Sequence, residues 1–115
     1  MHYISTRDSS QTPATFSDIL LAGLAPDGGL YLPQEYPQLD DATLTRWRKV
    51  LEEGGYAALA AAVLELFVDD ISAEDLREIT ARAYTFPKFS AEEIVPVTHL
   101  EGNLYIGCLL YTSPS

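Results

Sequence analysis

The side chains that could carry out chemistry are few and stand far apart along the sequence. The clearest candidate is Asp27-Gly28-Gly29, because glycines allow several backbone amides to converge on a phosphate group. A phosphate-binding loop leads into the N-terminus of a helix, whereas the residues after Gly29 are apolar and of extended character. We therefore interpret Gly28-Gly29 as a turn, where glycine supplies the positive φ angles that turns require.

The remaining nucleophiles and bases are isolated from one another. His2 and His99 are too far apart in the sequence to predict a metal-binding pair, and each is predicted to be a surface or strand residue. Cys108 lies in an apolar run without a neighbouring base, which is typical of an inert thiol. Lys88 follows a proline in a predicted turn, where a lysine is usually solvated. The sequence therefore predicts no catalytic, cofactor-binding or metal-binding residue.

One acidic cluster remains, formed by Asp69, Asp70, Glu74 and Asp75. It would attract a cation, but it lacks the central glycine and the alternating ligands of an EF-hand loop. Acidic residues are also favoured at the N-termini of helices, where they interact with the helix dipole. We interpret the cluster as part of a helix N-terminus.

Composition limits the kind of protein this is. A chain of 115 residues with 47% hydrophobic residues predicts one globular domain with one core. The net charge of −10 would repel the phosphates of nucleic acids and of anionic lipids, so neither nucleic acid nor membrane is an expected partner. The sequence has no apolar run long enough for a membrane span and no recognisable signal peptide. A single cysteine is typical of a reducing compartment, which predicts a cytoplasmic location.

Hydrophobic periodicity and capping signals predict four helices and short strands. The helices are expected near residues 17–24, 41–53, 56–68 and 73–85, and the strands near 2–5 and, as a hairpin, 97–107. Leu30–Pro33 is expected to be a brief extended segment. Ser17 is the expected N-cap of the first helix, and a capping box of Ser72 with Asp75 is expected to open the last.

The alanine-rich helix near 56–68 is expected to be the central and most buried element. The side chains expected inside are Leu59, Val63 and Phe67 of this helix, and Leu76, Ile79 and Ala83 of the next. A second capping pattern, Ser90 with Glu93, is followed by Pro96, which leaves room for about one helical turn.

Several motifs resemble, in order and spacing, the N-terminal region of threonine synthases. They are Tyr3-Ile4-Ser5-Thr6-Arg7, Phe16-Ser17-Asp18, the run from Gly23 through Asp27-Gly28-Gly29-Leu30 to Pro33, Ala83-Tyr84-Thr85-Phe86, Val97 to Leu100, and Leu104-Tyr105-Ile106. The resemblance covers about residues 1–107. Asp8 stands where the family usually has glycine, a departure that concerns only the local turn.

The resemblance implies an α/β fold: a small, helix-rich N-terminal domain with short strands and a C-terminal hairpin, from a pyridoxal-phosphate enzyme of fold-type II. Such enzymes are lyases of threonine biosynthesis that convert O-phospho-L-homoserine and water to L-threonine and phosphate. The family's cofactor-holding lysine lies in a Phe-Lys-Asp segment beyond the hairpin, and this sequence lacks that segment. We therefore expect the chain alone to bind no pyridoxal phosphate and to be inactive, with the missing catalytic domains of the same enzyme as its partner.

The resemblance breaks off at Cys108. Residues 1–107 are expected to be the threonine synthase N-terminal domain, and residues 108–115 a non-family tail of artefactual origin. An alternative of a different class is a stand-alone acidic helical module that binds a partner protein through its apolar faces.

Overall fold

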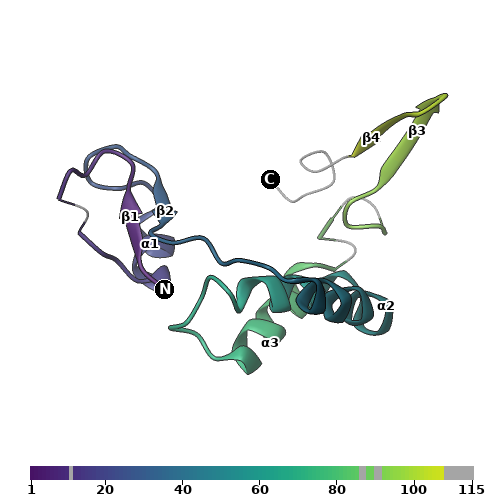
Figure 1. Cartoon of the computed structure of the whole chain (residues 1–115), viewed down its shortest axis with the longest axis horizontal. Coiled ribbons are helices and arrows are strands. Elements are labelled where there is room, and N and C mark those ends of the chain that lie inside the picture. Colours follow the sequence, from purple (N-terminus) through teal and green to yellow (C-terminus); the bar gives the residue numbers. More distant parts are fainter. Residues whose placement is uncertain (11, 86–87, 90–91, 108–115) are drawn as a thin grey trace.

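Two antiparallel strand pairs and three helices make up the described part of the chain (Figure 1). The computed structural model describes residues 1–10, 12–85, 88–89 and 92–107. Along the chain the elements are β1 (Tyr3–Ser5), α1 (Phe16–Ala22), β2 (Tyr31–Pro33), α2 (Asp41–Leu64), α3 (Ala73–Ala83), β3 (Val97–Glu101) and β4 (Leu104–Gly107). The small, helix-rich α/β fold is thus confirmed.

Residues 1–33 form the N-terminal unit, in which β1 pairs with β2 and α1 lies in the connection between them (Figure 1). Thr15, and not the predicted Ser17, is the N-cap of α1, because Thr15 has extended φ/ψ angles and its side chain accepts from the Asp18 amide. The Thr15 hydroxyl also donates to the Asp18 carboxylate at 2.8 Å. The helix ends at Gly23, which has a φ of 75°.

The helical pair consists of α2 and α3, and α2 contains the two helices predicted near 41–53 and 56–68. They are joined directly through Gly55, whose φ of 75° and ψ of −171° break the helix without a loop. Asp40 is the N-cap of α2, since its side chain accepts from the Thr43 amide at 2.7 Å. At the start of α3 the predicted cap is confirmed, because Ser72 accepts from the Asp75 amide at 3.1 Å.

The apolar core lies mainly between α2 and α3. Its buried members include Ala61, Val68 and Leu76. Thr80 is buried beside them, one helical turn after Leu76, and its hydroxyl donates to the Arg77 carbonyl at 3.1 Å. A polar side chain is tolerated there because the helix backbone accepts its hydrogen bond.

Two burial predictions are wrong. Ile79 and Ala83 are exposed, because α3 turns its Leu76 and Thr80 side toward α2. Leu59, Val63 and Phe67 are half-buried and not inside, although the segment near 56–68 is the least exposed of the predicted helices, with Ala61 and Val68 buried and most of its other residues half-buried. A single helical neighbour covers too little of α2 to bury a wider stripe.

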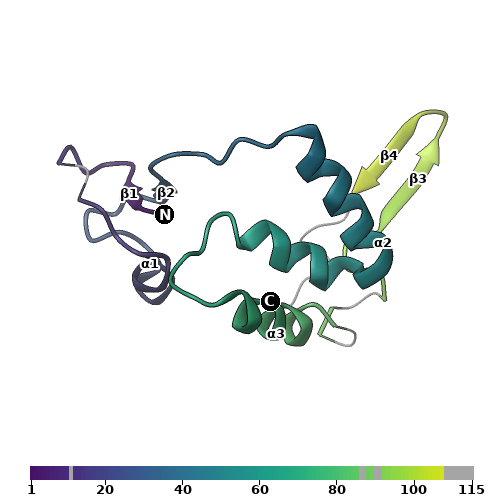
Figure 2. The same cartoon turned by 60° about the horizontal axis from the view of Figure 1, so that its bottom comes forward.

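The last strands form the predicted hairpin, which projects away from the helices (Figures 1 and 2). The register pairs Thr98 with Ile106 and His99 with Tyr105, and a bulge lies between His99 and Glu101. The predictions for Ser90 with Glu93, for Cys108 and for the tail at 108–115 rest on residues that lie outside the described part of the chain. No helix among the described residues is both long enough and apolar enough to cross a membrane.

Candidate functional site

A polar network ties the end of β1 to the glycine turn that precedes β2. The carboxylate of Asp27 accepts from the Ser5 hydroxyl and from the Gly29 amide, both at 2.8 Å through the same oxygen. Gly28 has a φ of 75°, and its amide donates to the Ala25 carbonyl at 2.8 Å. These contacts confirm that Gly28-Gly29 is a turn.

Thr6 closes the other side of this network. Its amide donates to the Leu30 carbonyl at 2.9 Å, and its hydroxyl accepts from the Leu30 amide at 3.0 Å. A phosphate-binding loop offers free backbone amides to its ligand. Here the amides of Gly29 and Leu30 already donate to the protein's own side chains, so the turn is not arranged as a phosphate cradle.

Gly29 fits where no other residue would. A Cβ atom at this position would lie 2.2 Å from the Ser5 hydroxyl oxygen and 2.9 Å from the Asp27 carboxylate. Ser5 is buried and bonded to Asp27, so its oxygen has little freedom to move aside. The close approach of strand and turn therefore requires glycine.

A cavity of about 410 Å³ opens beside this network, with Ser5, Asp8, Asp27 and Tyr31 in its lining. The carboxylate of Asp8 accepts from the Ser10 hydroxyl at 2.6 Å and from the Ser10 and Thr12 amides, and these bonds lower the pKa of Asp8 to about 2. Asp8 thus builds its own local turn. The charged side chains in the lining are carboxylates, which disfavours an anionic ligand.

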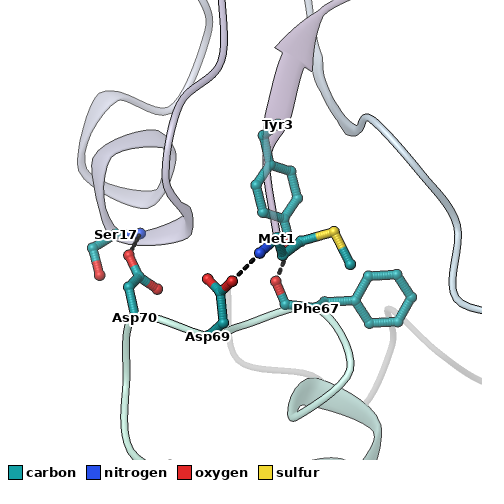
Figure 3. Close-up of polar contacts among 6 residues, drawn as sticks. All are labelled: Met1, Tyr3, Ser17, Phe67, Asp69 and Asp70. Atoms are coloured by element: carbon teal, nitrogen blue, oxygen red, sulfur yellow. Dashed lines mark hydrogen bonds and ion pairs between the residues drawn. The ribbon is translucent and has the colours of Figure 1, made fainter.

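A second polar junction attaches the N-terminal unit to the helical pair (Figure 3). The segment 67–70, which follows α2, receives three contacts: Tyr3 donates its hydroxyl to the Phe67 carbonyl at 2.6 Å, the α-amino group of Met1 pairs with Asp69, and the Ser17 amide donates to Asp70 at 2.8 Å. Burial raises the pKa of Tyr3, and the charge of Asp70 adds to that shift. The hydrogen bond from the Ser17 backbone lowers the pKa of Asp70.

The acidic cluster is therefore divided between two roles. Glu74 and Asp75 lie in the first turn of α3, as predicted. Asp69 and Asp70 instead contact the N-terminal unit, which the sequence analysis did not predict. No local signal could have shown this, because Ser17 and Asp70 are 53 residues apart in the sequence.

Comparison with known proteins places these features in a family. Residues 2–84 match the family model described as the threonine synthase N terminus. The chain belongs to the threonine synthase family. Threonine synthase of Corynebacterium glutamicum is 72% identical over 109 residues, covering 95% of this chain and 23% of that enzyme. Threonine synthase of Methylobacillus glycogenes is 46% identical over 114 residues, covering 92% of this chain and 23% of that enzyme.

The fold agrees as well. The crystal structure of threonine synthase from yeast matches 84% of this chain with a TM-score of 0.68 at 33% sequence identity, and the match covers 18% of the yeast chain. This chain thus spans about a fifth of the length of the threonine synthases that it matches. Two of the motifs that carry the resemblance meet in the polar network, through Ser5-Thr6 and Asp27 to Leu30, so at this place the motif residues form a structural joint.

The lysine and histidine side chains of this threonine synthase region make none of the junction contacts described above. The Lys49 side chain is 73% exposed and pairs with Glu53 at 3.7 Å. Lys88 donates to the Arg82 carbonyl at 2.7 Å. His99 lies on β3 with its Nε2 atom 2.9 Å from the Gly102 carbonyl, and His2 is exposed before β1. Among the described residues, no three or more histidine, cysteine or acidic side chains are grouped to hold a metal ion.

Proposed function

We propose that this chain is the leading part of a cytoplasmic enzyme that converts O-phospho-L-homoserine and water to L-threonine and phosphate. The support is membership of the threonine synthase family, with 72% identity to the Corynebacterium glutamicum enzyme over nearly the whole chain. The catalytic part would lie in the portion of the enzyme that this chain does not cover. In that portion we propose a fold-type II domain with bound pyridoxal phosphate, the group that supplies the electron sink for such lyases.

The described residues do not fit pyridoxal phosphate themselves. A site for it needs a lysine in a pocket that also anchors the cofactor's phosphate group. Lys49 is solvent-exposed and Lys88 bonds to a backbone carbonyl, and the cavity beside the glycine turn carries carboxylates. We therefore propose no catalytic or cofactor-binding residue in this chain, and we propose that it is inactive by itself.

Its contribution would be a cap that packs against the catalytic domains, and the observation that carries this is an exposed leucine surface. Leu20, Leu21, Leu24 and Leu30 are all more than 60% exposed, and Leu21 reaches 88%. Two of them, Leu20 and Leu30, line a groove of about 420 Å³ between α1 and β2 together with Phe16. Exposed apolar surface that includes such a groove marks a contact with other protein.

A chimaeric enzyme tests this proposal. Residues 1–107, which we take as the family portion with 108–115 outside it, would replace the matching N-terminal region of the Corynebacterium glutamicum enzyme. The chimaera should release phosphate from O-phosphohomoserine, because 72% identity preserves most contacts at the shared interface. The controls are the same enzyme without any N-terminal region and the present chain alone, and both should be inactive.

Two outcomes would contradict the proposal. A folded chimaera that releases no phosphate would favour the stand-alone interaction module. Phosphate release by the chain alone would show that catalytic residues are present within it.

A further inference from the structure

The β3–β4 hairpin exposes both of its faces to solvent. All nine of its strand residues are exposed. Because side chains alternate along a strand, Tyr105 points to one face, with its partner His99 at a ring distance of 4.8 Å, while Leu104 and Ile106 point to the other. Val97 adds a further apolar side chain to the face of Tyr105.

Apolar residues on both faces are unusual for a solvated antiparallel ribbon. Antiparallel sheets at a surface carry polar residues on the solvent side, whereas strands with apolar residues on both sides belong to sheets that are covered on both faces. A two-stranded hairpin alone in water is also only marginally stable. The hairpin therefore has the composition of an inner part of a larger sheet.

The position of the hairpin separates it from the rest of the chain. It extends away from α2 and α3 in both views (Figures 1 and 2). The family model for the threonine synthase N terminus ends at residue 84, before the hairpin. Similarity to the Corynebacterium glutamicum enzyme nevertheless covers 95% of this chain, so the hairpin is threonine synthase sequence that lies outside the N-terminal family model.

We propose that β3–β4 is the first element of the next domain, where it adds its strands to the edge of a β-sheet formed by the part of the enzyme that follows. This inference rests on the proposed function, because the partner is the rest of the same threonine synthase. Edge pairing would satisfy the outward backbone groups of one hairpin strand, and the partner domain would cover the apolar side chains on both faces. The N-terminal domain, expected to end at residue 107, would then end before Val97, and residues 97–107 would belong to the next domain.

Hydrogen exchange tests the assignment in the chimaera and in the chain alone. In the chain alone, amides of α2 and α3 serve as the internal reference, and those of 97–107 should exchange at nearly the unprotected rate. In the chimaera the amides of 97–107 should exchange at least about 100-fold more slowly than in the chain alone. Protection of the hairpin equal to that of α2 and α3 in the chain alone would overturn the assignment.

A substitution pair gives a second test. Ile106→Lys places a charge on an apolar face of the hairpin, whereas Asn103→Lys places the same charge at its exposed turn. In the chimaera Ile106→Lys should lower the apparent melting temperature by about 5 °C or more, because it would bury a charge at the new interface. Asn103→Lys in the chimaera, and both variants of the chain alone, should show no comparable change.

The outcomes separate this inference from the proposed function. A protected hairpin in an inactive chimaera would support the sheet assignment and contradict the proposed function. An active chimaera with an unprotected hairpin would support the proposed function and contradict the sheet assignment. Protection that increases with the concentration of the chain alone would show that a second copy pairs with the hairpin, which would also overturn the assignment.

Discussion

The strand pairs β1–β2 and β3–β4 have the same antiparallel two-stranded form and opposite surroundings. In β1 both Tyr3 and Ser5 are buried, one against segment 67–70 and the other in the network around Asp27. In β3–β4 every strand residue is exposed. Because Tyr3 of β1 also exchanges two backbone hydrogen bonds with Ala14, the difference indicates that backbone and side-chain contacts outside a two-stranded ribbon together decide whether it is part of a core.

The largest effect is expected from a matched glycine pair, one in each ribbon. Gly29→Ala should lower the free energy of unfolding by about 2–3 kcal/mol, because its Cβ would lie 2.2 Å from the Ser5 hydroxyl oxygen. Gly107→Ala on β4 should change it by less than about 0.5 kcal/mol, since nothing lies within 4 Å of the added atom. Urea unfolding followed by circular dichroism measures both.

Equal losses of unfolding free energy in Gly29→Ala and Gly107→Ala would contradict the contrast between the two ribbons. A double variant, Gly29→Ala with Ser5→Ala, identifies the cause. Removing the Ser5 hydroxyl should recover part of the stability lost in Gly29→Ala, because the closest atom is then absent. No recovery would mean that the Asp27 carboxylate and the Thr6 hydroxyl, at 2.9 and 3.0 Å from the added atom, set the requirement for glycine.

A smaller effect is expected from removing one tyrosine hydroxyl in each ribbon. Tyr3→Phe deletes the donor to the Phe67 carbonyl at 2.6 Å and should cost about 1 kcal/mol. Tyr105→Phe should cost close to nothing, because Tyr105 is 59% exposed on the hairpin. Thermal unfolding of the two variants gives the comparison, and a neutral Tyr3→Phe would show that the junction with segment 67–70 contributes little to stability.

The smallest effect concerns pH and Asp70. Its folded pKa lies below the unfolded value of about 3.9, so its stabilisation is complete above that pH and is lost as pH falls through the folded pKa. The melting temperature of the native chain should therefore exceed that of Asp70→Asn at pH 7, and the gap should narrow below about pH 4. Glu101→Gln on the hairpin is the control, and its melting temperature should follow the native one. A gap for Asp70→Asn that widens in acid would contradict the assigned contact.

Features set by neighbours in sequence could be predicted. The cap at Ser72 involves a residue three positions away, and the glycine turn at 28–29 is encoded by backbone freedom. The same reasoning chose the wrong cap for α1, because the Ser17 amide bonds to Asp70 across the junction while Thr15 caps the helix. Thr15 and Ser17, two positions apart, look equally suitable as N-caps until the distant partner of Ser17 is known.

Burial and the junctions could not be predicted because they depend on contacts across long stretches of sequence. Periodicity identified the apolar stripe of α3 but not how far it rotates toward α2, so Thr80 is buried where Ile79 was expected. The Ser5–Asp27 bond spans 22 residues and the Tyr3–Phe67 bond spans 64. The family motifs include Ser5 and Asp27, but the motifs alone did not reveal that the contact between them is structural.

Residues 34–40 connect the N-terminal unit to α2, and this connection has a consequence for the polar junction. The part-buried hydrogen bond of Tyr3 contributes roughly 1 kcal/mol and the exposed bond of Ser17 adds to it, whereas association of two separate molecules costs on the order of 4–15 kcal/mol. A short tether instead holds the two parts at an effective concentration on the order of millimolar. The docked arrangement therefore depends on chain connectivity as much as on its contacts. Cleavage of the chain between Gln34 and Asp40 would let residues 1–33 dissociate from the helical pair.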